Sequence, residues 1–369
     1  MGYEVDFLPV GNGEKSGDAI AVRFGDLNGR RDQQFVMVID GGTQESGQSL
    51  VDHIIKYYGT KHVDLVVNTH PDADHASGLS VVLDQLRVGR LWMHRPWDHS
   101  DRICHMFNDG RITHGGLSAR LQAELEHARY LEKQAKRKGI PVDEPFAGLS
   151  LSNIGGTVSV LGPTQQYYEA LLTDFRSTPE KKEAYSLAAS LMRSFQEGAV
   201  ALAQRVMESF GVETLEEPAD DATSAENNSS AILLIQIDGR QLLFTGDAGV
   251  PALERADDWA EWSGIALTEC GFTQVPHHGS RRNVGPSILD RIVGPRRDVD
   301  VPDKVAFVSA SKDAPKHPSR KVTNAYRRRG ARVLTTEGVS KWHHSPDAPF
   351  RADYTAAEPV PFYSVVEED

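Results

Sequence analysis

The chain has 369 residues, an ordinary apolar fraction of 39% and a formal net charge of −12, which fits one large α/β domain with insertions, or two domains. Its two cysteines, Cys104 and Cys270, lie far apart and exclude a disulfide framework or a zinc-ribbon pattern. No apolar run approaches the ~20 residues that span a bilayer, and the chain does not begin like a signal peptide, so we expect a cytoplasmic protein without membrane contact.

Strands and helices are predicted to alternate along most of the chain. The segments with strand character are 3–10, 19–25, 34–39, 64–68, 91–94, 231–238, 241–245, 268–275, 305–309, 332–335 and 340–343. The segments with helical character are 49–58, 78–86, 251–263, 286–292 and 319–329. This alternation favours layered α/β packing.

Two stretches interrupt the alternation. Residues 118–138 predict a long charged helix, and residues 165–210 predict one or more helices, followed by a mobile acidic loop over 214–226. We interpret them as insertions at about 96–140 and 165–226 in a single domain over 1–355, which a tail at 356–369 follows. The sequence leaves open whether they form a lid, a substrate-selecting wall, or a contact with a second copy or a partner protein.

A loop crowded with potential metal ligands, here called the signature loop (residues 68–78), follows the apolar run 63–67. It contains His70, Asp72, Asp74 and His75. Carboxylates crowded at the end of a buried strand repel one another, and desolvation raises their pKa, so a divalent cation would remove a large cost. The alternative is a polar turn that caps the next helix.

Further ligand candidates follow other predicted strands. Asp247 comes after Gly246, which allows a tight turn. His277 and His278 end another apolar segment, and His317 lies in a loop after a third. Because ligands gather beyond the carboxyl ends of strands in α/β sheets, these positions predict one shared site.

Taken in order, these motifs resemble the metallo-β-lactamase superfamily and, within it, the soluble domain of the ComEC-type competence proteins. Further matching pieces are residues 16–20, 39–42 and 227–231. The resemblance implies an αββα four-layer sandwich of two mixed sheets with metals at one edge. Two departures stand out: Asp72 replaces a usual histidine, and Asn227 or Asn228 stands where a histidine usually precedes the Gly-Asp element. An oxygen-rich site admits Mn²⁺ as well as Zn²⁺.

The resemblance also implies roles for single residues. Two divalent ions, Zn or Mn, are expected, one on His70, Asp72 and Asp247 and the other on Asp74, His75 and Asp247. One of His277 and His278, together with His317, would complete the set. The residues expected to carry catalysis are Asp74, His75 and Asp247.

Supporting residues are expected around these ligands. Asp40 and Asp18 match positions behind the signature loop that orient it, although a turn-forming role explains them as well. Ser280, Arg281 and Lys312 are candidates for phosphate contacts, or ordinary loop residues.

The charge distribution bears on the substrate. Residues 275–345 carry 15 Lys and Arg against 6 Asp and Glu, which indicates either a face for an anion or ordinary solvated helix surface. We therefore favour a phosphodiesterase or nuclease that uses a metal-bound hydroxide on nucleic acid or nucleotides. The alternatives are a hydrolase of a small lactone, thioester or β-lactam-like substrate, and a metal-bearing subunit of a larger assembly.

Overall fold

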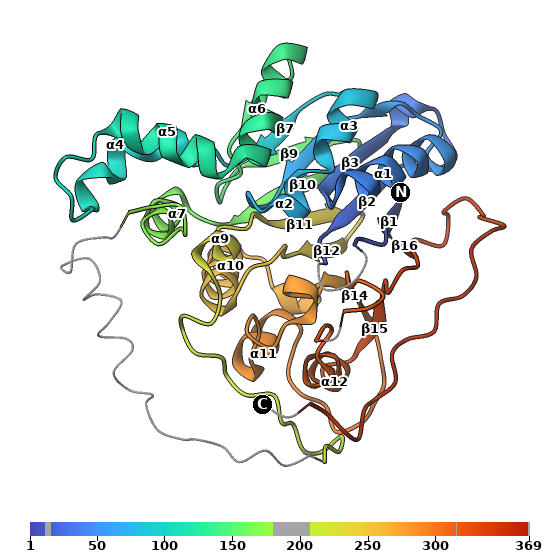
Figure 1. The fold of residues 1–369 in the computed structure, drawn as a ribbon. Helices are drawn as coiled ribbons and strands as arrows, with labels where there is room; N and C mark the ends of the chain where they lie inside the picture. The colour runs from blue at the N-terminus through green and yellow to red at the C-terminus, as the bar shows by residue number, and fades with distance from the viewer. Residues whose placement is uncertain (12–15, 180–206, 315, 368–369) are drawn as a thin grey trace.

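Two seven-stranded β-sheets form the centre of the computed structural model, which describes residues 1–11, 16–179, 207–314 and 316–367 (Figure 1). The sheets pack face to face, because apolar side chains of both meet in one buried cluster in which the rings of Phe7 and Phe272 are in contact. Helices cover the outer face of each sheet. The αββα sandwich expected from the sequence is thus confirmed.

The first sheet has the strand order β16-β1-β2-β3-β5-β7-β8. Its strands are β1 (Gly2–Phe7), β2 (Ala19–Gly25), β3 (Gln34–Gly41), β5 (Leu65–Asn68), β7 (Leu91–Met93), β8 (Val142–Asp143) and β16 (Lys341–His344). Strands β3, β5, β7 and β8 run parallel, whereas β16, β1, β2 and β3 pair antiparallel. A separate small sheet joins β4 (His62–Val63) to β6 (Arg87–Val88).

The second sheet has the order β15-β14-β13-β12-β11-β10-β9. Its strands are β9 (Ser150–Asn153), β10 (Gly156–Gly162), β11 (Ile232–Ile237), β12 (Arg240–Phe244), β13 (Phe272–Gln274), β14 (Lys304–Val308) and β15 (Ala331–Thr335). Strands β12 to β15 are parallel, so their carboxyl ends lie at one edge. Strands β8, β9 and β10 were not among those predicted, and the strand expected over 268–275 begins only at Phe272, after a 3₁₀ turn.

Eleven α-helices fall within the described residues. They are α1 (Gln44–Tyr57), α2 (Ala73–Ala76), α3 (Leu79–Gln85), α4 (Ser100–Ile103), α5 (His114–Glu124), α6 (Glu126–Lys138), α7 (Gln165–Leu172), α9 (Ala225–Asn228), α10 (Val250–Trp262), α11 (Pro286–Ile292) and α12 (Arg320–Arg328). The 3₁₀ turns are η1 (Arg31–Gln33), η2 (Pro96–His99), η3 (Cys104–Met106), η4 (Leu267–Glu269) and η5 (Pro276–Gly279). Among the described helices, none has the length and apolar character that a bilayer crossing requires.

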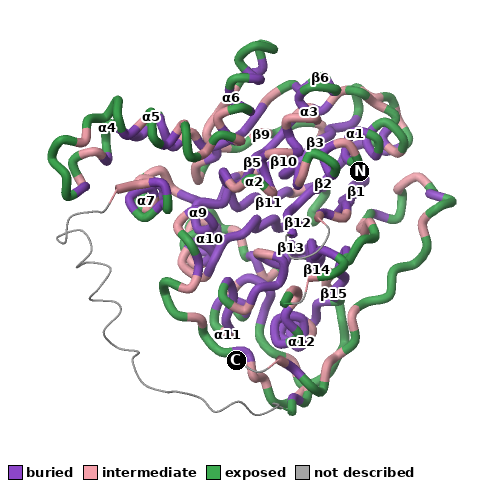
Figure 2. The backbone as a smooth tube through the Cα atoms, in the orientation of Figure 1, coloured by how far each residue is buried: buried purple, intermediate pink, exposed green. Residues whose placement is uncertain are grey.

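Strand β2 illustrates how the sequence builds these layers. Its alternate residues Ile20 and Phe24 face the opposite sheet, whereas Ala19 and Ala21 face the outer helices. Side chains alternate between the faces of a strand, so a strand buried on both sides needs a nearly continuous apolar run. Figure 2 shows such buried residues running through the strands of both sheets.

The helical insertions differ in part from expectation. The single helix predicted over 118–138 is wrong: the chain forms α5 and α6, which are separated at Leu125, where φ is −103° and ψ is 49°. Both helices contribute buried residues to the cluster on the outer face of the first sheet. Of the helices predicted over 165–210, α7 is present, and residues 180–206 lie outside the described part. Residues 214–224 contain no strand or helix.

Candidate metal centre

The predicted ligands follow strands that end at the same edge of the two sheets. Strand β5 leads into the signature loop and α2, and β12 leads through a tight turn to Asp247. Strand β13 leads into the 3₁₀ turn that contains His277 and His278, whose φ angles are 44° and 57°. Non-glycine residues rarely adopt positive φ, and such strained backbone occurs most often at functional sites.

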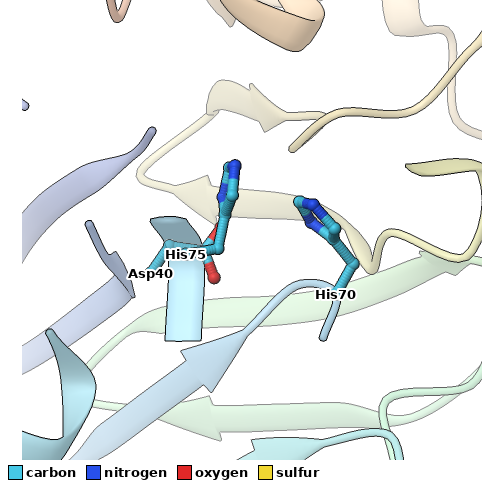
Figure 3. A group of neighbouring side chains, drawn as sticks. All are labelled: Asp40, His70 and His75. Carbon is cyan, nitrogen blue, oxygen red and sulfur yellow. The ribbon is translucent and has the colours of Figure 1, made fainter. Parts of the chain in front are cut away.

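Four imidazoles surround one carboxylate oxygen at this edge. The Oδ2 atom of Asp247 lies 3.9 Å from His70 Nε2, 3.4 Å from His75 Nε2, and 3.7 Å from the Nε2 atoms of both His277 and His278. Figure 3 shows His70 and His75 side by side, with the carboxylate of Asp40 at the base of His75. The fold thus brings together five of the predicted ligands.

Each of these rings is held from behind through its Nδ1 atom. His75 Nδ1 lies 2.9 Å from Asp40 Oδ2, His277 Nδ1 lies 2.8 Å from Asn283 Oδ1, and His278 Nδ1 lies 3.0 Å from the carbonyl oxygen of Ser309. These acceptors require a proton on Nδ1, and therefore leave the lone pair on Nε2 in a neutral ring.

His70 is held in the same way through Thr69. The Thr69 hydroxyl donates to Asp40 Oδ2 at 2.6 Å, so its oxygen is left to accept from His70 Nδ1 at 3.0 Å. The backbone N–H of Thr69 also donates to Asp40 Oδ1 at 2.8 Å. Asp40 consequently fixes the start of the signature loop and the rings of both its histidines.

The converging donor atoms fit a divalent cation. Within the described part of the chain, His70 Nε2, His75 Nε2 and Asp247 Oδ1 are buried without a hydrogen-bond partner. Lone pairs that face one another in a buried site are costly unless a cation stands between them. Two atoms that each lie about 2 Å from one ion in tetrahedral geometry are about 3.3 Å apart, close to the observed separations. His75, Asp247 and His278 form one group with ligand atoms within 4.8 Å of one another.

The electrostatics of the site also favour positive charge. Burial alone would raise the pKa of Asp247, but the surrounding imidazoles hold it well below the usual range. Burial opposes protonation of His75, yet the charges of Asp247 and Asp40 raise its pKa well above the ordinary value. Burial lowers the pKa of His278 to about 3, so this ring is neutral at physiological pH and can donate a lone pair to a cation.

Asp18 lies behind the site and connects to the turn that carries Asp247. Its Oδ2 atom accepts a hydrogen bond of 2.8 Å from the Gln274 side chain, whose Oε1 in turn accepts from the backbone N–H groups of Thr245 and Gly246 at 3.0 and 3.1 Å. Gly246 has a φ of 53°, and a Cβ there would lie 3.1 Å from the Thr69 hydroxyl. Burial raises the pKa of Asp18 to about 7.

The remaining ligand candidates lie at the margin of this group. Asp72 and Asp74 stand at the start of α2, half-buried, and neither belongs to the donor groups found among the described residues. The His317 ring lies beside His277, with centroids 6.2 Å apart. Asn227 faces His277, with its Nδ2 atom 3.4 Å from the His277 Nδ1, whereas Asn228 turns away and accepts from the N–H of Gly249.

The candidates for phosphate contacts lie on the two loops beside the histidines. Ser280 is buried, and its hydroxyl accepts a hydrogen bond of 3.2 Å from the N–H of Arg282. Arg281 is half-buried, and Arg282 and Lys312 are exposed.

Much of the basic character of residues 275–345 is neutralised within the fold. The arginines that form ion pairs with carboxylates are Arg291, Arg297, Arg327, Arg328 and Arg329. Arg328, which is fully buried, lies 3.0 Å from Glu208. Arg291, Arg328 and Arg329 pair with carboxylates from outside this segment, so part of the local excess of positive charge is structural.

Sequence reasoning missed four residues that organise the site. Thr69, Asn283 and Gln274 hold ligands or their turns, and Arg176, just beyond α7, contacts Asp72 with its Nη2 atom 3.1 Å from Oδ2. Thr69 lies inside the signature loop and Asn283 just after the histidine pair, so proximity in sequence was an available signal for these two. No signal in the sequence pointed to Arg176.

Part of the chain matches a known family model. A family model described as the metallo-beta-lactamase superfamily matches residues 30–108, which include the signature loop. No curated protein shows a significant match to the chain.

Several solved structures are similar to the chain at low identity. The metallo-beta-lactamase fold protein YhfI from Bacillus subtilis is 8% identical, with a TM-score of 0.41, over 94% of this chain and 100% of that one. A diphosphatase from the PhnP family is 10% identical, with a TM-score of 0.38, over 93% and 98%. A metallo-beta-lactamase from Hirschia baltica is 11% identical, with a TM-score of 0.32, over 78% and 96%. Similarities of this size say nothing about the substrate. Residues 30–108, with the signature loop, are thus similar to the metallo-beta-lactamase superfamily.

Proposed function

We propose that the protein is a metal-dependent hydrolase that cleaves phosphodiester bonds in nucleic acid or nucleotides. The observation that carries the proposal is the convergence of four imidazole Nε2 atoms on Asp247 Oδ2, at 3.4–3.9 Å. A buried arrangement of this kind needs a divalent cation, and Zn²⁺ and Mn²⁺ both suit a mixture of imidazole and carboxylate donors.

The residues of the chain prepare the site before any substrate binds. His75, His278 and Asp247 would hold the cation, with His70 and His277 beside them. When bound, the cation supplies Lewis acidity and lowers the pKa of water toward neutrality. Asp40 and Thr69 fix the rings of His70 and His75, so little reorganisation is needed. Asp74, in the first turn of α2, is the further carboxylate that we assign to catalysis.

Positive charge beside the histidines supports a phosphate-containing substrate. Arg282 follows the His277–His278 turn, and Lys312 and Lys316 precede His317; all three are exposed. The buried, paired arginines such as Arg328 cannot meet a ligand, so these loops are where the basic region could contact an anion. The motif resemblance to ComEC-type competence proteins points in the same direction.

An activity screen of the purified chain tests the proposal. Single-stranded DNA, duplex DNA, RNA, a generic phosphodiester and a lactone are offered with added Mn²⁺ or Zn²⁺. We expect turnover of at least one phosphodiester, lost in Asp74→Ala and retained in Asp258→Ala, which removes an exposed carboxylate on α10 that pairs with Arg291. If the lactone alone is turned over, the substrate is a carbonyl compound and the phosphodiesterase proposal is wrong.

A further inference from the structure

One arginine of the helical insertion contacts the signature loop at the margin of the metal centre. The Nη2 atom of Arg176 lies 3.2 and 3.1 Å from the two carboxylate oxygens of Asp72. Its Nε and backbone N–H both donate to Glu226 Oε1, at 3.1 and 2.7 Å. Glu226 is buried and immediately precedes Asn227, which faces His277. Arg176 therefore ties the signature loop to the segment on the opposite side of the site.

The two groups of potential ligands differ in whether their carboxylate has an open oxygen. In the group of His75, Asp247 and His278, the His75 Nε2 and Asp247 Oδ1 atoms have no hydrogen-bond partner among the described residues. In the group of Asp40, His70 and His75, Asp40 already accepts three hydrogen bonds, of 2.6–2.9 Å, from Thr69 and His75. Asp40 is thus committed to positioning.

Besides Asp247, whose Oδ2 atom lies 3.9 Å from His70 Nε2, a second cation on the His70 side would draw on a further carboxylate. Asp72 is the candidate for this role, since it lies two residues after His70 in the same loop. In the structure both oxygens of Asp72 are engaged by the guanidinium of Arg176. A guanidinium and a divalent cation compete for the same carboxylate, because each neutralises it.

We propose that Arg176 neutralises Asp72 and so weakens cation binding on the His70 side of the site. The chain then holds one cation tightly, at His75, Asp247 and His278, and a second one weakly. The inference rests on the metal centre of the proposed function, and it assigns Arg176 as a positioning residue that sets the affinity for the second cation.

The surroundings of Arg176 allow it to release Asp72. The contact borders a cavity of about 320 Å³ whose lining includes Asp72, Arg176, Glu226 and His127. The Arg176 side chain is 70% exposed, and that of Asp72 is 27% exposed. An ion pair this open to solvent has a small interaction free energy. Removal of the arginine should therefore raise the affinity for the second cation by about fivefold.

Metal titration of the chelator-treated protein tests the inference without any substrate. Calorimetry with Zn²⁺ or Mn²⁺ alone should give one tight and one weak binding event in the wild type. In Arg176→Gln, which removes the charge but keeps a polar side chain beside Glu226, the dissociation constant of the weak event should fall about fivefold. Arg176→Lys restores the charge and should return that constant close to the wild-type value.

Two controls separate this effect from damage to the insertion. Arg102→Ala breaks a contact with Glu169 of α7 and leaves Asp72 untouched, so both binding events should be unchanged. In Asp72→Asn the contested carboxylate is absent, and Arg176→Gln should then have no further effect.

The outcomes also separate this inference from the proposed function. An unchanged weak event in Arg176→Gln, with the tight event intact, overturns the role of Arg176 and leaves the hydrolase proposal standing. Two equally tight events in the wild type also overturn it. The absence of any cation binding overturns both proposals.

Discussion

His278 Nε2 and Asp247 Oδ2 lie 3.7 Å apart although they follow different strands. Strands β12 and β13 are parallel neighbours in which Leu242 pairs with Phe272, so the turns that follow them leave the sheet at the same edge. Asp247 also faces His70, His75 and His277. One carboxylate thereby connects ligands from both sheets.

Removal of that carboxylate should abolish metal binding at the tight site and with it turnover. In Asp247→Ala four imidazole lone pairs face one another without a negative charge between them, and the cation loses its central ligand. We expect elemental analysis of the purified variant to find less than half of the wild-type metal. Asp258→Ala is the matched control and should bind metal normally. An unchanged metal content in Asp247→Ala would show that the ligands lie elsewhere.

Asp40 should control metal affinity without contacting the metal. Asp40→Asn keeps a residue type that tolerates the φ of 54° observed there, but it removes the charge that holds Thr69 and His75. We expect the cation dissociation constant to rise about 10- to 100-fold, as for other partners that orient metal-binding histidines. The melting temperature of the metal-free variant serves as the control for folding. Wild-type affinity in a folded variant would contradict this role.

The sequence predicted the fold class and the main elements because their signals are local. Strand β12 is a short apolar run that ends at a glycine turn, and the parallel order of β12, β13 and β14 brings such ends together. Strand β10 alternates polar and apolar residues over Thr157–Val160 and could have been found by its period of two. The break at Leu125 has no glycine or proline to indicate it.

Long-range pairing accounts for what the sequence could not predict. Arg328 and Glu208 are 120 positions apart, so no count of local charge reveals that they neutralise each other. The same holds for Arg176 and Asp72, which are 104 positions apart. The excess of Lys and Arg over residues 275–345 overstated the exposed basic surface for this reason.

The exposed cations beside the histidines should govern binding of a polyanion. Arg282→Glu combined with Lys312→Glu reverses two exposed charges on the loops that flank His277 and His317. Binding of a single-stranded oligonucleotide should weaken, and the slope of log K against log salt should become shallower by about 1.4 if both cations contact phosphates. Arg332→Glu reverses an exposed charge near the start of β15, away from the carboxyl edge, and should leave the slope unchanged. An unaltered slope in the double variant would show that the oligonucleotide does not contact these two side chains.

Arg351 should set the resistance of the fold to acid. It reaches back to the first strand, where it donates to both oxygens of Asp6 at 2.6 and 3.0 Å and to Glu4 at 2.9 Å, and all three side chains are buried. Burial alone would raise the pKa of Asp6, but the charge of His53 and its hydrogen bond, together with those of Arg351, hold it below the ordinary range.

A carboxyl group whose pKa is lower in the folded protein than in the unfolded chain stabilises the fold at any pH above its pKa in the unfolded chain, which is near 4. This stabilisation is lost as the pH falls toward the pKa in the folded protein. Arg351→Ala should therefore raise the pH at which the protein unfolds in acid. It should also lower the free energy of unfolding at neutral pH by about 3–5 kcal/mol, because two buried carboxylates lose a partner.

Urea unfolding at pH 7 and an acid titration followed by circular dichroism measure both effects. Lys56→Ala, which removes the exposed ion pair with Asp353, is the control and should change neither result noticeably. If Arg351→Ala unfolds in acid at the wild-type pH, the ionised form of Asp6 does not depend on Arg351, and its other partners, His53 and the Tyr58 hydroxyl, must carry that stabilisation.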